Sequence, residues 1–147
     1  MPAPTLTTQQ IGRLGELLVQ FELLRYGIES APLTTDAGID LVAYSPARTR
    51  AHTIQVKTNL APKPAGGKGP PSFDWWVPDD CPAELFALVE LATRRIWLFN
   101  RDELHANSQQ RSSGRCHLYV HAGPHARHGA HRLAQFLLEN RLAELFL

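Results

Sequence analysis

Two stretches of the 147-residue chain decide its fold: GIDLVAY at residues 38–44 and TIQVKT at residues 53–58. Side chains alternate across a β-strand, so Gln55 and Lys57 share one face of the second stretch, and Asp40 occupies one face of the first. The segment between the two stretches is polar and rich in turn formers, which predicts a hairpin of adjacent antiparallel strands. If these strands pair, a carboxylate, an amide and an ammonium group converge.

A helix is predicted upstream of the two strands. Thr7 followed by Gln10 is a capping-box pattern, and Gly27 suits a left-handed C-cap. One apolar stripe of this helix contains Leu14, Leu17, Leu18, Phe21 and Leu24. A second stripe contains Gly12, Glu16, Val19 and Leu23.

Glycines in this helix predict close contact with the sheet. Gly12 and Gly15 each lower helix stability by roughly 1 kcal/mol relative to Ala, so their presence is better explained by packing than by helix propensity. Such an approach brings Glu16, the polar member of its stripe, toward the two strands.

Together the three segments resemble the PD-(D/E)XK nuclease superfamily, and more narrowly its small members related to intron-encoded and Holliday-junction-type endonucleases. The matching residues are Gly15-Glu16, DAGIDL at residues 36–41 and QVK at residues 55–57, in the family's order. The resemblance implies an α/β, restriction-endonuclease-like fold with a central mixed β-sheet flanked by helices. In one departure, Gln55 replaces the family's usual second acid, as in a recognised Gln-x-Lys subgroup, which removes one negative charge.

The resemblance also implies a catalytic set of Glu16, Asp40, Gln55 and Lys57 and a Mg²⁺ (or Mn²⁺) cofactor. Mg²⁺ prefers oxygen ligands, which here are the Asp40 carboxylate, the Gln55 side-chain oxygen and the Val56 carbonyl. Glu16 would hold a coordinated water or a second ion. Lys57 would orient the attacking water and offset phosphorane charge, because a lysine with an ordinary pKa near roughly 10.4 is a poor general base.

Each of these residues also has a purely structural interpretation. Gln55 and Lys57 fit the outward polar positions of a half-exposed strand. Glu16 could pair with Arg13 or Gln20 on a solvated helix face.

The two aspartates near the first strand have structural alternatives as well. Asp40 could accept backbone hydrogen bonds at a strand end. Asp36 could shape the turn before Gly38 or approach the metal, and we favour the turn.

Composition predicts one domain over residues 1–147, a size that buries about two thirds of the unfolded surface. No stretch is apolar and long enough to span a bilayer, and the first residues lack a secretory signal, so a reducing cytoplasm is expected. Cys81 and Cys116 are isolated, so neither a disulfide nor a zinc site is predicted for them.

Positive charge is concentrated late in the chain, although the formal net charge is only +1. Between Leu104 and Leu138 there is no Asp or Glu, and six of the seven histidines lie there. This pattern predicts a surface for the phosphates of DNA, with RNA as an open alternative. The basic residues of this stretch are Arg111, Arg115, Arg127 and Arg132.

The spacing of His125, His128 and His131 raises the possibility of zinc binding, but neighbouring glycines disfavour a helix and no thiol or acid completes a local ligand set. A loop that contacts phosphates, or a solvated loop, is the preferred interpretation.

Residues 61–72 form a Pro/Gly-rich segment predicted to be a long, flexible loop. Its Lys63 and Lys68 could close over a bound nucleic-acid strand, and a mobile surface insertion is the alternative.

The remaining elements extend the sheet. Strands are predicted at residues 73–77, 85–91, 95–99 and 117–120, and a short helix at residues 101–105. One tryptophan of Trp75-Trp76 is expected in the core and the other could meet a partner or a base, with core packing preferred for both. The amphipathic segment 131–147 must pack on this domain or on a second subunit, and a homodimer is expected because paired sites cut both strands of a duplex.

The leading hypothesis is a Mg²⁺-dependent DNA endonuclease. The first rival is a nuclease-fold module that binds DNA or aids assembly without catalysis. A second rival is a protein-interaction domain that uses Trp75-Trp76 and the C-terminal helix.

Overall fold

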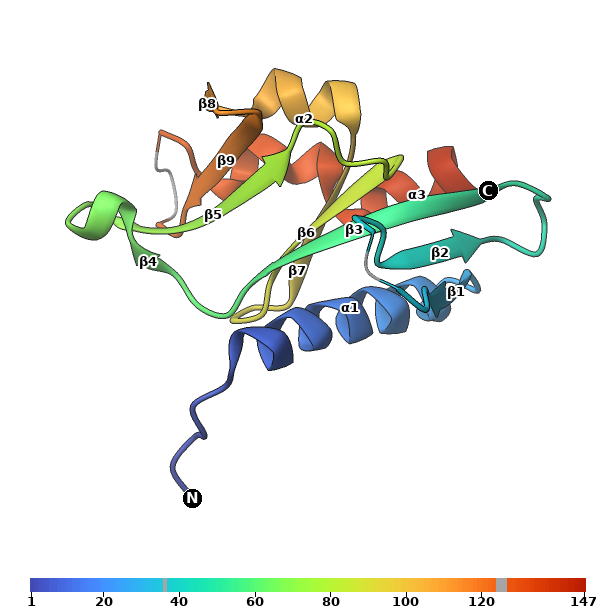
Figure 1. The fold of residues 1–147 in the computed structure, drawn as a ribbon, viewed down its shortest axis with the longest axis horizontal. Coiled ribbons are helices and arrows are strands. Elements are labelled where there is room, and N and C mark those ends of the chain that lie inside the picture. Colours follow the sequence, from blue (N-terminus) through green and yellow to red (C-terminus); the bar gives the residue numbers. More distant parts are fainter. Residues whose placement is uncertain (36, 124–126) are drawn as a thin grey trace.

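A computed structural model of the chain describes residues 1–35, 37–123 and 127–147. Strands and helices follow one another in the order shown in Figure 1. The first half contains α1 (Thr8–Arg25), β1 (Glu29–Pro32), β2 (Leu41–Tyr44), β3 (Ala51–Asn59), β4 (Lys63–Pro64), the 3₁₀ turn η1 (Ala65–Gly67) and β5 (Pro71–Pro78). The second half contains β6 (Leu85–Glu90), β7 (Arg95–Asn100), α2 (Arg101–Asn107), β8 (Gln110–Ser112), β9 (Arg115–His121), the 3₁₀ helix η2 (Ala130–Phe136) and α3 (Leu138–Phe146).

The strands form two sheets. The larger has the order β1-β2-β3-β6-β7 and is mixed, because β3 and β6 are parallel and the other neighbours are antiparallel. The smaller, β4-β5-β9-β8, is antiparallel. The predicted antiparallel pairing of residues 38–44 with residues 53–58 and the predicted central mixed sheet are therefore confirmed.

Each face of the larger sheet has its own core. Alternation along β6 sends Leu85, Ala87 and Val89 to one core, together with residues of α1 and α3, and sends Phe86 and Leu88 to the other. The second core also contains side chains of the smaller sheet, α2 and η2. The sheet is thus covered by α1 and α3 on one face and by the smaller sheet with α2 and η2 on the other (Figure 1).

Helix α1 begins where the capping box predicted, since Thr7 and Gln10 exchange side-chain-to-backbone hydrogen bonds. The second predicted stripe packs on the sheet through Val19 and Leu23. Most of the first stripe is exposed, against the expectation that a strongly apolar face is buried. Its solvent-exposed members are Leu14, Leu17, Phe21 and Leu24.

Gly15 fixes which face of α1 meets the sheet. A Cβ atom at this position would lie 1.8 Å from Thr58 Oγ1, so only glycine permits this approach. Gly12 has no atom within 4 Å of such a Cβ, so the predicted packing role holds for Gly15 and was wrong for Gly12.

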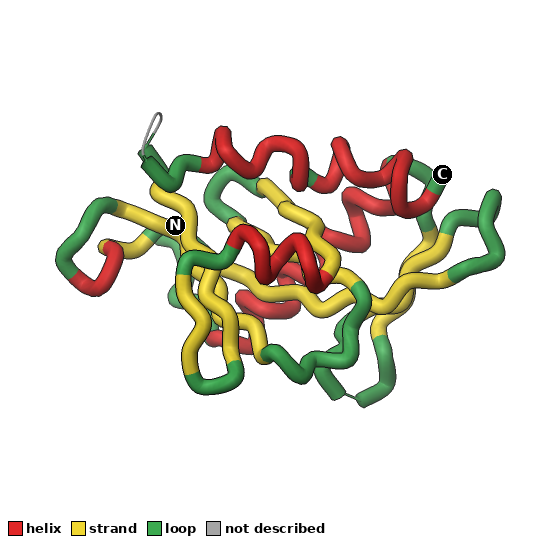
Figure 2. Tube along the Cα trace, turned by 90° about the horizontal axis from the view of Figure 1, so that it is seen from above, coloured by secondary structure: helices red, strands yellow, loops and turns green. Residues whose placement is uncertain are grey.

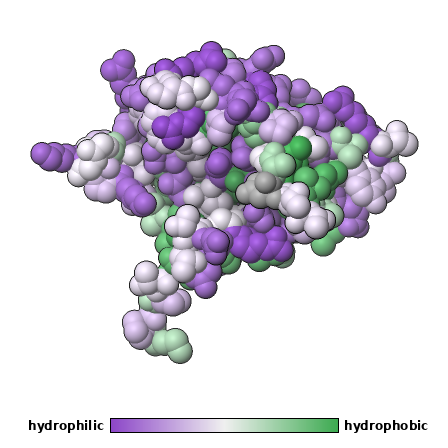
Figure 3. Space-filling view, viewed as in Figure 1, coloured by the Kyte–Doolittle hydropathy of each residue, from purple (hydrophilic) through white to green (hydrophobic). Residues whose placement is uncertain are grey.

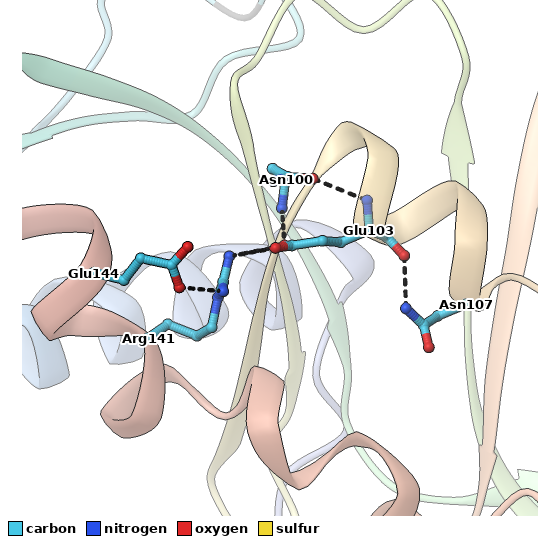
Figure 4. A network of polar contacts seen from close by, with 5 residues as sticks. All are labelled: Asn100, Glu103, Asn107, Arg141 and Glu144. Carbon is cyan, nitrogen blue, oxygen red and sulfur yellow. Dashed lines mark hydrogen bonds and ion pairs between the residues drawn. The ribbon is translucent and has the colours of Figure 1, made fainter.

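The C-terminal segment packs on this domain. Figure 2 shows η2 and α3 running along one side of the strands toward the C-terminus. Leu142 and Phe146 are buried in the core beside α1. Arg141 ties α3 to α2 because its Nη2 lies 2.8 Å from both Glu103 carboxylate oxygens, and Glu103 also completes the α2 capping box (Figure 4).

Residues 61–72 differ from the continuous loop predicted for them. They contain the two-residue strand β4 and the turn η1, and β5 already begins at Pro71. The prolines are tolerated because β4 is an edge strand.

On the face shown in Figure 3 the surface is largely hydrophilic, and the N-terminal residues project from the body. Within the described residues, none of the helices combines the length and apolar character needed to traverse a bilayer.

Candidate active site

Asp40 lies at the entrance to β2 and is held on the neighbouring strand by backbone contacts. Its N–H donates to the Ile54 carbonyl at 2.9 Å, and its Oδ2 accepts the Val56 N–H at 2.7 Å. The β2–β3 register pairs Leu41 with Ile54, so Asp40 falls opposite Gln55. The carboxylate is therefore positioned by the sheet itself.

Gln55 and Lys57 reach the same cleft from β3. The cleft has a volume of about 590 Å³ and is bounded by the first turns of α1, by Asp40 and by the end of β3. Gln55 is only 8% exposed, and its Oε1 is buried without a hydrogen-bond partner within the described residues. Lys57 is half-buried. Asp40, Gln55 and Lys57 are thus brought together, with Val56 also on the cleft wall.

Glu16 lies beside this cleft and not in it. It lines a smaller adjoining hollow with Ile39 and Asp40, so Asp40 borders both spaces. The Glu16 carboxylate accepts from Arg13 Nη1 at 2.9 Å, which is the structural alternative that the helix pattern allowed. Arg13 holds Oε2, so a role toward a ligand of the cleft falls to the other carboxylate oxygen, Oε1.

The donor set of the cleft fits a hard divalent cation. Mg²⁺ takes oxygen ligands, and one or two carboxylates with waters and substrate oxygens suffice. Asp40 supplies a carboxylate, and Gln55 Oε1 supplies a buried neutral oxygen. Without a cation this oxygen has lost its hydration and gained no hydrogen bond in exchange within the described residues, which costs free energy. Asp36, the other aspartate considered near this site, lies outside the described residues.

Of the predicted basic residues, Lys63 is closest to the cleft and lines its edge. Lys63 also lines a second hollow, of about 410 Å³, over the smaller sheet. It therefore lies on the border between the cleft and this hollow. Lys68 is exposed beyond η1, and Arg111 is exposed on β8. The structure thus separates the basic residues into one near the cleft and several over the smaller sheet.

The outer face of the smaller sheet carries an aromatic and cationic row. The sequence indicated its positive charge through Arg115 and the histidines, but not the stacking of these residues on aromatic rings. The His117 ring stacks on Trp76 with centroids 4.1 Å apart, and the Arg115 guanidinium lies 4.8 Å from the Trp76 ring centroid. Tyr119 and His121 continue the row along β9. The alternation RCHLYVH at residues 115–121 was the signal, since every second residue is polar or aromatic.

His128 joins this row and has an altered pKa. Burial lowers the pKa of His128 from its ordinary value of 6.5, and the nearby positive charges of Arg127, His121 and Arg132 lower it further. Its ring packs edge-on to Tyr119 with centroids 5.1 Å apart. His125, which shares the predicted zinc-binding spacing with His128, lies outside the described residues.

Solved structures with this fold include two nucleases. A bacterial homing endonuclease superposes with a TM-score of 0.63 at 12% sequence identity, covering 93% of each chain. Hjc, a Holliday junction resolvase from the archaeal hyperthermophile Archaeoglobus fulgidus, superposes with a TM-score of 0.51 at 16% identity, covering 73% of this chain and 82% of that one.

These similarities confirm the predicted α/β fold with a central mixed sheet and show that a homing endonuclease and a Holliday junction resolvase share it, as the resemblance implied. No protein-family model matches the sequence, and no curated protein matches it.

Proposed function

We propose that this protein is a metal-dependent DNA endonuclease that hydrolyses phosphodiester bonds. The observation that carries the proposal is the convergence of Asp40, Gln55 and Lys57 on one cleft, with a buried, unsatisfied amide oxygen among them. The shared fold with two nucleases supports the same activity.

In this proposal Asp40, the Gln55 side chain and the Val56 carbonyl hold Mg²⁺ or Mn²⁺. When bound, the ion supplies Lewis-acid stabilisation of phosphoryl charge. Lys57 orients the attacking water and offsets the negative charge that develops on the phosphate. Glu16 would position a second water or cation at the border of the cleft through its oxygen that Arg13 does not hold.

DNA would enter along the basic side chains. Lys63 and Lys68 would contact phosphates next to the cleft, and the aromatic and cationic row would extend the contact over the smaller sheet. Arg111, Arg115, Arg127 and Arg132 would provide the further phosphate contacts. Trp76 adds a flat surface on which an unpaired base could stack after Arg115 moves aside.

A homodimer would place two such clefts on one duplex. Because α3 packs on its own domain, the exposed stripe of α1 is the surface we assign to a second copy. Phe21, in the middle of this exposed stripe, is 60% exposed. Phe21→Glu should convert a dimer to a monomer in analytical ultracentrifugation, whereas a monomeric wild type excludes this assembly.

Cleavage of duplex, branched and single-stranded DNA with Mg²⁺ or Mn²⁺ tests the proposal. We expect Asp40→Asn and Lys57→Ala to reduce cleavage at least about a hundredfold while DNA affinity stays within a few fold. Asp102→Asn, an exposed carboxylate on α2, is the matched control and should cleave like wild type. Equal activity in all four proteins would identify a contaminant and defeat the proposal. RNA substrates belong in the same assay.

A second candidate is a nuclease-fold module that binds DNA without cutting it. The Arg13–Glu16 ion pair and the amide at position 55 favour it, because both reduce negative charge available to a cation. Inert wild type and variants with retained DNA affinity would select this candidate. The protein-interaction hypothesis loses two of its three proposed contacts, because Trp75 is only 3% exposed and α3 is packed on the sheet. Core packing was wrong for Trp76, which lies on the outer face of the smaller sheet beside His117.

The cytoplasm is the proposed location, in line with the free thiols of Cys81 and Cys116.

A further inference from the structure

A cluster of three metal-ligating side chains lies away from the candidate active site. Asp79 follows the end of β5, His105 belongs to α2 and Cys116 to β9. One ligand atom from each lies within 4.8 Å of the other two. None of these residues lines the cleft that contains Asp40.

The fold brings the three residues together by ordinary packing. The β5–β9 register pairs Val77 with Cys116, and alternation turns the Cys116 side chain into the core. The Asp79 N–H donates to the Gly114 carbonyl at 2.8 Å, which fixes the chain as it leaves β5. Helix α2 contacts β9, which places His105 over the same point.

Two of the three groups lack a protein partner for the atom that faces the cluster. Asp79 Oδ1 is buried without a hydrogen bond within the described residues. Cys116 is 1% exposed, and no hydrogen bond of its Sγ occurs among those residues. Buried oxygen atoms are normally satisfied, so Asp79 Oδ1 indicates a missing ligand, whereas the buried Cys116 thiol is an available ligand and needs no partner of its own.

The spacing matches tetrahedral zinc. His105 Nε2 lies 3.5 Å from Asp79 Oδ1, too far for a good hydrogen bond but close to the edge of about 3.4 Å expected between nitrogen and oxygen ligands of zinc. The sulfur lies within 4.8 Å of the other two atoms and needs to approach by up to about 1.3 Å to complete the set. Thiolate and imidazole ligands also favour zinc over Mg²⁺.

Two arginines lie near Asp79, and neither occupies the oxygen that faces the cluster. Arg111 Nη2 lies 3.9 Å from the other carboxylate oxygen, Asp79 Oδ2, and so leaves Oδ1 to the cluster. Arg101 Nη1 donates to the Asp79 carbonyl at 2.7 Å and does not contact the side chain. Burial of Cys116 argues against a nucleophile, because a substrate could not reach its sulfur.

We propose that Asp79, His105 and Cys116 bind a zinc ion whose fourth ligand is water. The Asp79 and His105 side chains are 31% and 23% exposed, so the site lies near the surface although its ligand atoms face inward. Binding releases the thiol proton and links β5, α2 and β9. This site does not depend on the proposed nuclease activity.

Titration of the full chain with Co²⁺, a spectroscopic substitute for zinc, tests the site. We expect one equivalent to give a thiolate-to-cobalt charge-transfer band that excess Zn²⁺ abolishes. His105→Gln and Asp79→Asn should each weaken binding at least about tenfold, and Cys116→Ser should remove the band. His105→Gln and Asp79→Asn change partly exposed side chains, so they test the site even if Cys116→Ser does not fold.

Cys81→Ser is the matched control, because Cys81 is equally buried but donates to the Gly38 carbonyl. It should keep the band, as should Asp40→Asn, which tests only the proposed nuclease site. A wild type without the band, or a band unaffected by His105→Gln and Asp79→Asn, overturns the zinc site. A band lost in Cys81→Ser or His128→Ala would place the metal elsewhere and also overturn it.

Discussion

At the scale of single residues, the contact between α1 and β3 depends on one missing methyl group. We expect Gly15→Ala to lower the free energy of unfolding by about 1–3 kcal/mol, because its Cβ would overlap Thr58 Oγ1 and lie 2.9 Å from Thr58 Cβ. Thr58 is β-branched, so few side-chain rotamers could relieve the overlap with the added methyl group. Urea denaturation followed by circular dichroism measures the change.

Gly12→Ala is the internal comparison for Gly15→Ala, since open space surrounds its Cβ. It should raise stability by up to about 1 kcal/mol through helix propensity. If both variants lose the same stability, the close approach at Gly15 is not the cause.

The imidazole of His128 gives a pH-dependent prediction. Its lowered pKa means that, in NMR titrations of the folded protein, the His128 ring should protonate at a midpoint below 6.5. Arg132→Gln should move that midpoint upward, because one nearby positive charge is removed. A midpoint at or above 6.5 in the wild type would contradict the environment described for this ring.

The sign of the stability effect follows from the same lowered pKa. The unfolded chain binds a proton on His128 more tightly than the folded chain does. Above pH 6.5 the ring is neutral in both states, so His128 then does not lower the free energy of unfolding. Its contribution to stability should decline as pH falls from 6.5 toward the lowered pKa. Phosphates of bound DNA should raise the pKa of His128 and strengthen binding in acid.

At the scale of elements, the link between α2 and α3 can be tested separately from the cores. Arg141→Met should destabilise the protein by about 1–3 kcal/mol, less than a fully buried pair, because the Arg141 and Glu103 side chains are 8% and 23% exposed. Thermal or urea unfolding measures the loss.

Glu144 provides the contrast for Arg141. It contacts the same guanidinium at 2.8 Å, but its side chain is 69% exposed. Glu144→Gln should therefore change stability by no more than about 0.5 kcal/mol. If Glu144→Gln lowers the free energy of unfolding as much as Arg141→Met does, the buried contact of Arg141 with Glu103 is not the stabilising one.

Elements with strong periodicity were predictable, and short or exposed ones were not. The pattern located β2, β3, β6, β7 and the capped start of α1. It missed β1, an exposed edge strand that ends in proline, and β8, three exposed residues. It joined η2 to α3, although the extended backbone of Leu137 separates them.

The sites show the same division. Alternation alone predicted that Asp40, Gln55 and Lys57 converge, because neighbouring strands fix which faces coincide. The position of Glu16 depends on the rotation of α1, which Gly15 sets and the two competing stripes left undecided. The residues of the proposed zinc site come from three elements distant in sequence, so no local spacing predicted them.

At the scale of the whole molecule, DNA affinity should depend on salt. The proposed phosphate contacts release counterions, so the logarithm of the association constant should fall linearly with the logarithm of salt concentration. Lys63→Ala should reduce that slope by about 1, because Lys63 lies between the cleft and the smaller sheet. Fluorescence anisotropy with labelled duplex measures the slope, and an unchanged slope would remove Lys63 from the interface.

The parallel pairing of β3 with β6 has a consequence for how the chain assembles. Parallel neighbours need a long crossover, and here that crossover contains β4 and β5, which belong to the other sheet. Before β3 can pair with β6, the chain between them must close a loop, and that loop contains two of the four strands of the smaller sheet. Neither sheet forms an autonomous folding unit, so the molecule should denature in a single cooperative step.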